Sequence, residues 1–93
     1  MNHSDYNQIF PTGDLHVVQQ YVDEHHWTIN DVRADGNCVL RWTCKNGYLL
    51  VAQWLVQHFN LTVNDARADN NSAFRYACGN GHLPVAQWLA GHF

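Results

Sequence analysis

The sequence predicts an all-α helix-turn-helix solenoid of about two and a half 34-residue repeats. One observation is a repeat in strict register. Gly13, Gly47 and Gly81 are spaced by 34 residues, and Val-Ala-Gln-Trp-Leu occurs at 51–55 and again at 85–89. A second observation is that apolar residues recur at helical spacing within each period. A fixed period of this length indicates stacked units, because one short helix pair cannot bury its apolar face alone.

The repeats define the expected organisation of the chain. A helix is predicted near 15–25, and it forms the second half of an incomplete first unit. We expect an N-terminal segment that is able to form a short cap, followed by a repeat domain with three unit boundaries. These ranges are 1–12 for the segment, 13–93 for the domain, and 13–26, 27–60 and 61–93 for the units.

Each full unit is predicted to contain two helices. In the last unit, residues 72–79 begin with a serine, which favours a helix start, and Asn80-Gly81 ends this helix. A second helix is expected over 83–89, with Pro84 in its first turn, where a missing N–H costs little. Residues 60–71 are rich in Asn, Asp and Ala with little helical pattern. We therefore expect an extended turn or hairpin-like connection there.

Length and charge limit the function classes. The chain has 93 residues, which corresponds to one domain and leaves little room for a large enclosed catalytic cavity. Five Lys+Arg against eight Asp+Glu give a net charge of -3, which argues against a nucleic-acid or anionic-membrane surface. No apolar stretch approaches the roughly 18–20 residues of a membrane helix.

The cellular location is predicted from the start of the chain and from its cysteines. The first residues show neither the positive charge nor the apolar run of a secretory signal. The three cysteines are an odd number, which favours reduced thiols. We therefore expect an intracellular protein, cytoplasmic or nuclear.

Three motifs carry a resemblance to a known family. Asn-Gly-His-Leu-x-Val-Ala-x-Trp-Leu at 80–89 resembles the Gly-His-Leu-x-x-Val-x-x-Leu-Leu of the ankyrin repeat. Val63-Asn64 is similar to the Val-Asn before the finger of that repeat, and Ala77-Cys78 to its paired small residues. The resemblance covers residues 13–93. The motif sequence resembles the divergent ankyrin repeats found in protists and giant viruses. It implies an ankyrin-type solenoid that binds an unknown protein partner and is not an enzyme.

The sequence departs from the family pattern at one repeated position. The family's Thr-Pro-Leu-His is replaced by Cys-Val-Leu-Arg at 38–41 and by Ser-Ala-Phe-Arg at 72–75. Both copies therefore place an arginine where the family has a hydrogen-bonding histidine. Two substitutes stay open: an arginine paired with Asp35 or Asp69, and an arginine that is only solvated.

The resemblance also implies a partner-binding surface on the fingers and on the exposed edge of the first helices. Arg41 and Arg75 lie side by side in this arrangement and would suit an acidic partner. Several of the positions are identical in both copies, so solvated turn residues of a repeat consensus remain the alternative. The positions are Val32, Ala34, Asp35, Asn37, Arg41, Lys45 and Asn46 in one unit, and Ala66, Ala68, Asp69, Asn71, Arg75, Gly79 and Asn80 in the next.

Two other functions remain as alternatives. One is a metal- or ligand-binding helical domain, which is suggested by the seven histidines, three cysteines and four tryptophans. The spacing contains neither Cys-x-x-Cys nor His-Glu-x-x-His, so we expect no metal site, no cofactor and no catalytic residue. Cys44 and Cys78 are instead predicted as small core residues, and Trp54 and Trp88 as packing residues. The other alternative is a structural domain that oligomerises through uncapped repeat ends, because terminal repeats usually need a polar outer face.

Overall fold

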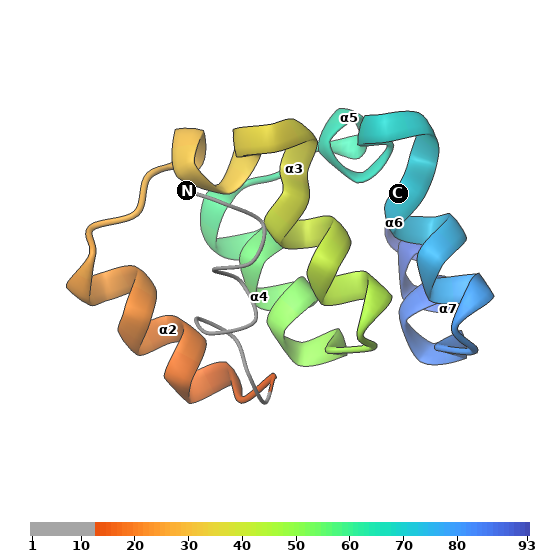
Figure 1. The fold of residues 1–93 in the computed structure, drawn as a ribbon, viewed down its shortest axis with the longest axis horizontal. Coiled ribbons are helices and arrows are strands. Elements are labelled where there is room, and N and C mark those ends of the chain that lie inside the picture. Colours follow the sequence, from red (N-terminus) through yellow and green to blue (C-terminus); the bar gives the residue numbers. More distant parts are fainter. Residues whose placement is uncertain (1–12) are drawn as a thin grey trace.

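A computed structural model describes residues 13–93, and this part of the chain contains helices and no strand (Figure 1). The all-α prediction is confirmed. The N-terminal segment 1–12, predicted as a short cap, lies outside the described residues. The helices are α2 (Leu15–Glu24), α3 (Ile29–Lys45), α4 (Leu49–Phe59), α5 (Val63–Ala66), α6 (Ala68–Gly79) and α7 (Leu83–His92).

Helix α2 begins at a side-chain cap. Asp14 is its N-cap residue, and the Asp14 carboxylate accepts a hydrogen bond from the backbone N–H of His16 at 2.9 Å. Val18 and Val22 lie one helical turn apart and are buried, whereas the opposite face is polar and exposed. The buried stripe places α2 against α4.

Helices α3 and α6 are each interrupted by a short left-handed turn. Residues 35–37 and 69–71 all have positive φ between 55° and 66°. In front of each turn lies a short helical segment, which begins at Thr28 in α3 and at Thr62 in the separate helix α5. We call residues 35–37 and 69–71 the finger turns, because they occupy the finger positions of the repeat.

The hairpin-like connection expected over 60–71 is wrong. The structure places helix α5 and the second finger turn there instead. The reason is a capping box: the Thr62 and Asp65 side chains each bond the other's backbone N–H, and Thr28 and Asp31 do the same. The Thr-x-x-Asp spacing was the available sequence signal.

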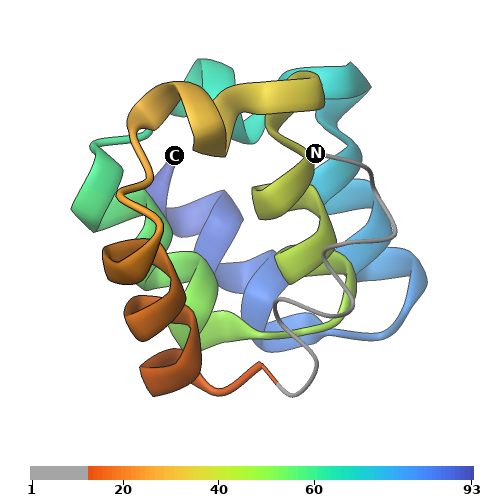
Figure 2. The ribbon, with the colours of Figure 1, turned by 60° about the vertical axis from the view of Figure 1, so that its left-hand side comes forward.

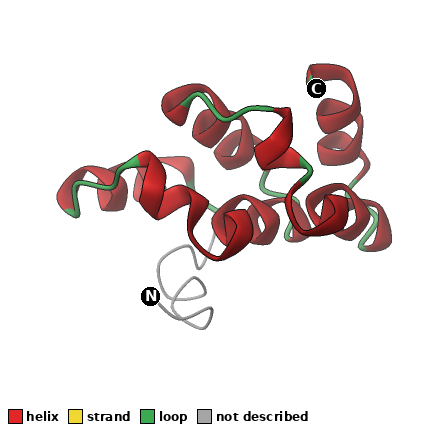
Figure 3. Ribbon diagram, turned by 90° about the horizontal axis from the view of Figure 1, so that it is seen from above, coloured by secondary structure: helices red, strands yellow, loops and turns green. Residues whose placement is uncertain are grey.

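The helices form two layers. Helices α3 and α6 pack side by side, α4 packs against α3, and α7 packs against α6. Figures 1 and 2 show this arrangement, with the short helical segments side by side along one edge of the stack, at the top of Figure 1. Figure 3 shows that the connections between helices are short. Each of the last two units is thus a helix pair, stacked on its neighbour.

The core runs through both layers. Its fully buried side chains come from the inner faces of the helices, and the hydroxyl of buried Thr43 donates to the Val39 carbonyl at 2.7 Å. Since the buried residues of successive helices form one cluster, burial depends on stacking. The largest buried side chains are Leu40, Leu55, Val18, Val32, Val39, Val51, Val85, Thr43, Cys44 and Ser72.

Candidate binding surface

The arginine that replaces the family's histidine holds the finger turn of its own repeat. In the first turn, Arg41 Nε donates to the Gly36 carbonyl at 3.0 Å and Nη2 donates to the Asp35 carbonyl at 2.9 Å. Arg75 repeats this in the second turn, where Nε donates to the Asn70 carbonyl at 2.9 Å. These bonds satisfy carbonyl groups that a left-handed turn leaves outside the helix ladder.

Arg41 also connects the two repeats. Its Nη1 lies 3.1 Å from Asp69 Oδ2, and the Arg41 side chain is only 16% exposed. Of the two substitutes expected for the missing histidine, the structure shows the pair with Asp69. The guanidinium therefore joins the first finger turn to the second.

A second polar contact between the repeats is centred on Asp65. Arg33 donates to both carboxylate oxygens, with Nε–Oδ1 at 2.8 Å and Nη2–Oδ2 at 3.0 Å. Asn37 Nδ2 donates to Oδ1 at 3.1 Å, and the Thr62 backbone N–H donates to Oδ2 at 2.8 Å. A two-pronged contact of this kind fixes the relative position of the two repeats.

Asp65 is held in its charged form. Burial acts to raise the pKa of this carboxyl, but the hydrogen bonds from Arg33, Thr62 and Asn37 and the Arg33 charge outweigh it. The pKa of Asp65 consequently lies below its ordinary value. The sequence-based interpretation missed Arg33 and Asp65, although the Thr-x-x-Asp spacing marked the latter.

The predicted site residues divide by exposure. Val32, Asn37 and Ala66 are buried, so they are corrected from partner-binding to core or interface positions. Val32 and Ala66 face inward from the short helical segments, and Asn37 binds Asp65. The half-buried positions are Arg41, Asn46 and Ala68, and the exposed ones are Ala34, Asp35, Lys45, Asp69, Asn71, Arg75, Gly79 and Asn80.

Part of this set meets in one depression between α3 and α6, which we call the basic groove. Its volume is about 200 Å³, and its lining includes Arg41, Lys45, Trp42 and Tyr76. The Lys45 ammonium lies 5.7 Å from the centre of the Tyr76 ring, and Arg75 Cζ lies 5.8 Å from the same ring. These separations allow cation–π contacts. Two cationic side chains thus lie over the exposed Tyr76 ring, and a third, Arg41, lines the same groove.

Trp54 and Trp88 are packing residues, as predicted. Both are half-buried, and each stacks on the histidine one turn later, with ring centres 4.6 Å apart for His58 and 5.7 Å apart for His92. His58 and His92 therefore take part in ring stacking on the second helices.

The cysteines give one agreement and one correction. Cys44 is fully buried, and burial raises the pKa of its thiol to about 12. Cys78, the equivalent residue of the next repeat, is exposed, so its expected core position is wrong. Cys44 is covered because α6 packs against α3, whereas no described element packs against α6 in the same way.

Residues 13–93 contain no group of three or more His, Cys, Asp or Glu side chains arranged to hold a metal ion. Within those residues, every helix is too short or too polar to span a bilayer.

Comparison with known proteins gives one match. A family model described as ankyrin repeats in three copies matches residues 9–92, which is most of the chain. Searches of curated proteins and of solved structures gave no match.

Proposed function

Because the chain belongs to the ankyrin repeat family, whose members generally act as protein–protein interaction modules, we propose that it binds a protein partner through its finger turns and the basic groove. Members of this family are typically not enzymes, and we propose the same for this chain. We further propose an intracellular location, which the three free thiols support, and repeat boundaries at 27–60 and 61–93, which the two helix pairs support.

The observation that carries this proposal is the charge of the groove. The chain has five Lys and Arg residues and a net charge of -3, yet Arg41, Lys45 and Arg75 gather around Tyr76. Arg41 is already paired with Asp69, whereas Lys45 and Arg75 are exposed. The groove therefore favours a segment that carries carboxylates next to an apolar or aromatic side chain.

A peptide-display selection tests this proposal. Immobilised wild-type protein is expected to enrich Asp- and Glu-containing peptides, and Lys45→Glu is expected to weaken the selected peptides about tenfold or more. Binding is also expected to weaken as salt is raised, because exposed charges are screened.

The matched control is Arg67→Glu, which makes the same change of charge outside the groove. It should leave peptide binding unchanged. If both variants lose binding equally, only net charge matters and the groove is not the site. Selected peptides without carboxylates would contradict the proposed chemistry.

A second candidate function is assembly through the C-terminal end of the stack. The observation in its favour is an open pocket at that end, bordered by Phe74 and Phe93. Apolar side chains at a repeat end are normally covered by a neighbour or replaced by polar residues.

A further inference from the structure

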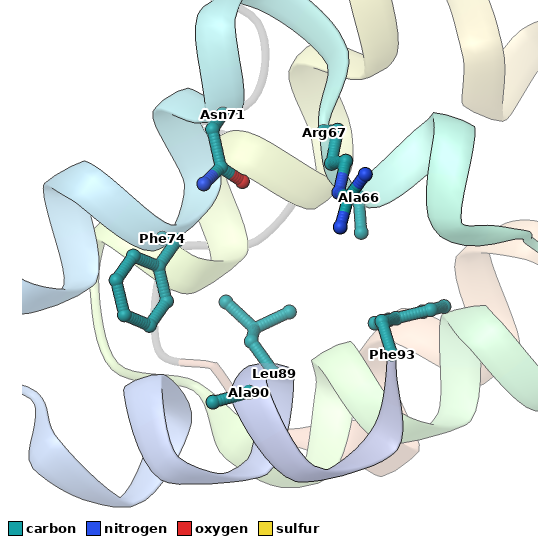
Figure 4. A pocket seen from close by; sticks show the side chains of 7 residues that line it. All are labelled: Ala66, Arg67, Asn71, Phe74, Leu89, Ala90 and Phe93. Atoms are coloured by element: carbon teal, nitrogen blue, oxygen red, sulfur yellow. The ribbon is translucent and has the colours of Figure 1, made fainter.

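The pocket at the C-terminal end of the stack has a volume of about 270 Å³. Figure 4 shows Phe74, Leu89 and Phe93 around an apolar hollow, with the side chains of Arg67 and Asn71 at its border. Two alanines complete the lining. The pocket combines apolar walls with two hydrogen-bond donors.

Every one of these lining residues has a counterpart 34 residues earlier, in the preceding repeat. The counterparts of the three apolar residues are Leu40, Leu55 and Phe59, which are exposed by 0%, 0% and 9%. Arg33 and Asn37 correspond to Arg67 and Asn71, and both bind Asp65 of the following repeat. The pocket is therefore an unfilled copy of the internal interface.

The internal interface shows what fills such a site. Helix α5 packs against α3 and brings the Asp65 carboxylate to Arg33 and Asn37. Neither Arg67 nor Asn71 makes a side-chain hydrogen bond or ion pair in the described part of the chain. The chemistry that matches this pair is an aspartate at the start of a short helix.

Two further contacts recur along the same face. Arg41 forms an ion pair with Asp69 of the following repeat, while the equivalent Arg75 forms no ion pair among the described residues and donates its hydrogen bonds to carbonyl groups of its own turn. A Cβ atom on Gly47 would lie 2.5 Å from His82 Nδ1, whereas the equivalent position on Gly81 meets open space. The Arg67 and Asn71 pair, Arg75 and Gly81 thus each lack the partner that their counterparts have in the following repeat.

We propose that this C-terminal face, formed by the pocket together with Arg75 and Gly81, docks one more repeat of the same type, stacked in line after α7. The occupant carries two aspartates four residues apart, as Asp65 and Asp69 are. Its first aspartate binds Arg67 and Asn71, and its second binds Arg75. This inference rests on the second candidate function and names its residues and the chemistry of its partner.

A second copy of this chain does not fit in that register. Helix α2 is the second helix of the repeat before α3, just as α4 is the second helix of the repeat before α6 and α7 is the second helix of the repeat that contains α6. A copy that placed its α3 after α6 would therefore bring its α2 into the space of α7. The docked unit must begin directly with its finger segment.

The test uses the full chain with an in-frame copy of residues 60–93 appended after Phe93, in which the cysteine of the appended copy is replaced by serine. The Tm of the extended chain is expected to exceed that of the original chain. Arg67→Glu should lower the Tm of the extended chain by at least about 5 °C. In the original chain, where Arg67 is exposed, the same substitution should change Tm by at most about 3 °C.

A second readout does not depend on stability. In the extended chain Cys78 should become as slow to react with a thiol reagent as Cys44, because the appended repeat covers it. Replacing the appended aspartate that corresponds to Asp65 with asparagine should reproduce the Arg67→Glu loss. Lys45→Glu is the control and should act equally in both chains.

Three results would overturn the inference. The first is an equal effect of Arg67→Glu in the two chains. The second is a Cys78 that reacts as fast after extension as before it. The third is an oligomer of the original chain that Arg67→Glu disperses in sedimentation, since the occupant would then be a second copy. Loss of peptide binding to the groove changes none of these readouts, so the two proposals fail independently.

Discussion

Cys44 and Cys78 occupy the same position of successive repeats and have opposite environments. Cys44 is enclosed where α6 packs against α3, whereas Cys78 lies on the open side of α6. Cys38 is also buried; burial raises the pKa of its thiol, although the Arg41 charge acts in the other direction. Three thiols in one small chain are thus expected to differ widely in reactivity, because the thiolate is the reacting form.

Thiol labelling checks this difference. At about pH 8, one thiol of the folded protein should react quickly, and Cys78→Ser should abolish that fast phase. Cys44 should react only on opening of the stack, so its rate should follow the population of opened molecules. Fast labelling of Cys44 in the folded protein would contradict the described packing.

At the residue scale, the repeat predicted which residues are equivalent, but it did not predict whether each of them is buried or exposed. The shared repeat position predicted that both Cys44 and Cys78 are buried, and this is confirmed for Cys44 alone. It could not predict exposed Cys78, since burial there depends on a neighbour that the described structure does not contain. Similarly, Val32 and Ala66 were assigned to the surface by resemblance, whereas the capping boxes turn them inward.

At the element scale, the turns between helices show how the units fit together. Gly47 and Gly81 have the same φ of +75°, but only Gly47 lies under a side chain of the following repeat. A side chain added at Gly81 is therefore penalised only by the backbone conformation, whereas one added at Gly47 also collides with the following repeat.

Substitution by alanine measures both costs. Gly81→Ala should lower the free energy of unfolding by about 1–2 kcal/mol, because alanine is strained in the left-handed region. Gly47→Ala should cost at least about 1 kcal/mol more, since its Cβ also collides with the His82 ring. Urea unfolding provides the comparison, and His82→Ala should recover the additional cost in the Gly47→Ala protein but not in Gly81→Ala. Equal costs for the two alanine variants would show that the His82 contact is absent.

The second helices were predictable from apolar spacing and from their glycine and proline boundaries, and their order along the chain is confirmed. The finger segments were not predicted correctly. Asn- and Asp-rich residues favour turns, and this tendency hid a helical segment of four residues. Its Thr-x-x-Asp cap was visible, but the left-handed turn at 69–71 is held by Arg75, from the part of α6 that follows the turn.

At the scale of the whole molecule, Asp65 and Arg33 join the two full repeats. The Asp65 side chain is only 7% exposed, and its carboxylate accepts hydrogen bonds from five donor atoms, which belong to Arg33, Asn37 and Thr62. Because its pKa is lowered in the folded state, it contributes stability above the unfolded-state pKa of about 3.9. That contribution is lost as the pH falls through the still lower folded-state pKa.

Acid unfolding of the Asp65→Asn variant checks this contribution. At neutral pH, Asp65→Asn should lower the free energy of unfolding by about 1–3 kcal/mol, because charge-assisted hydrogen bonds are lost. The difference from wild type should begin to shrink below about pH 4, where the carboxylate of the unfolded state becomes protonated, and should disappear as the folded-state carboxylate is protonated at still lower pH. Asp31→Asn is the matched control, since it removes the equivalent cap in a position without an arginine partner among residues 13–93. A difference that stays constant down to pH 2 would contradict the assignment.

The contact between Arg33 and Asp65 has a consequence for how such a chain lengthens over evolutionary time. Each unit carries both halves of the junction: an aspartate toward the unit before it and an arginine toward the unit after it. A duplicated 34-residue segment inserted behind α7 therefore meets a matching surface from the first generation, and no compensating substitution is required. Within residues 13–93, one such junction is closed, between Arg33 and Asp65, and the arginine half of the next junction stays open at Arg67.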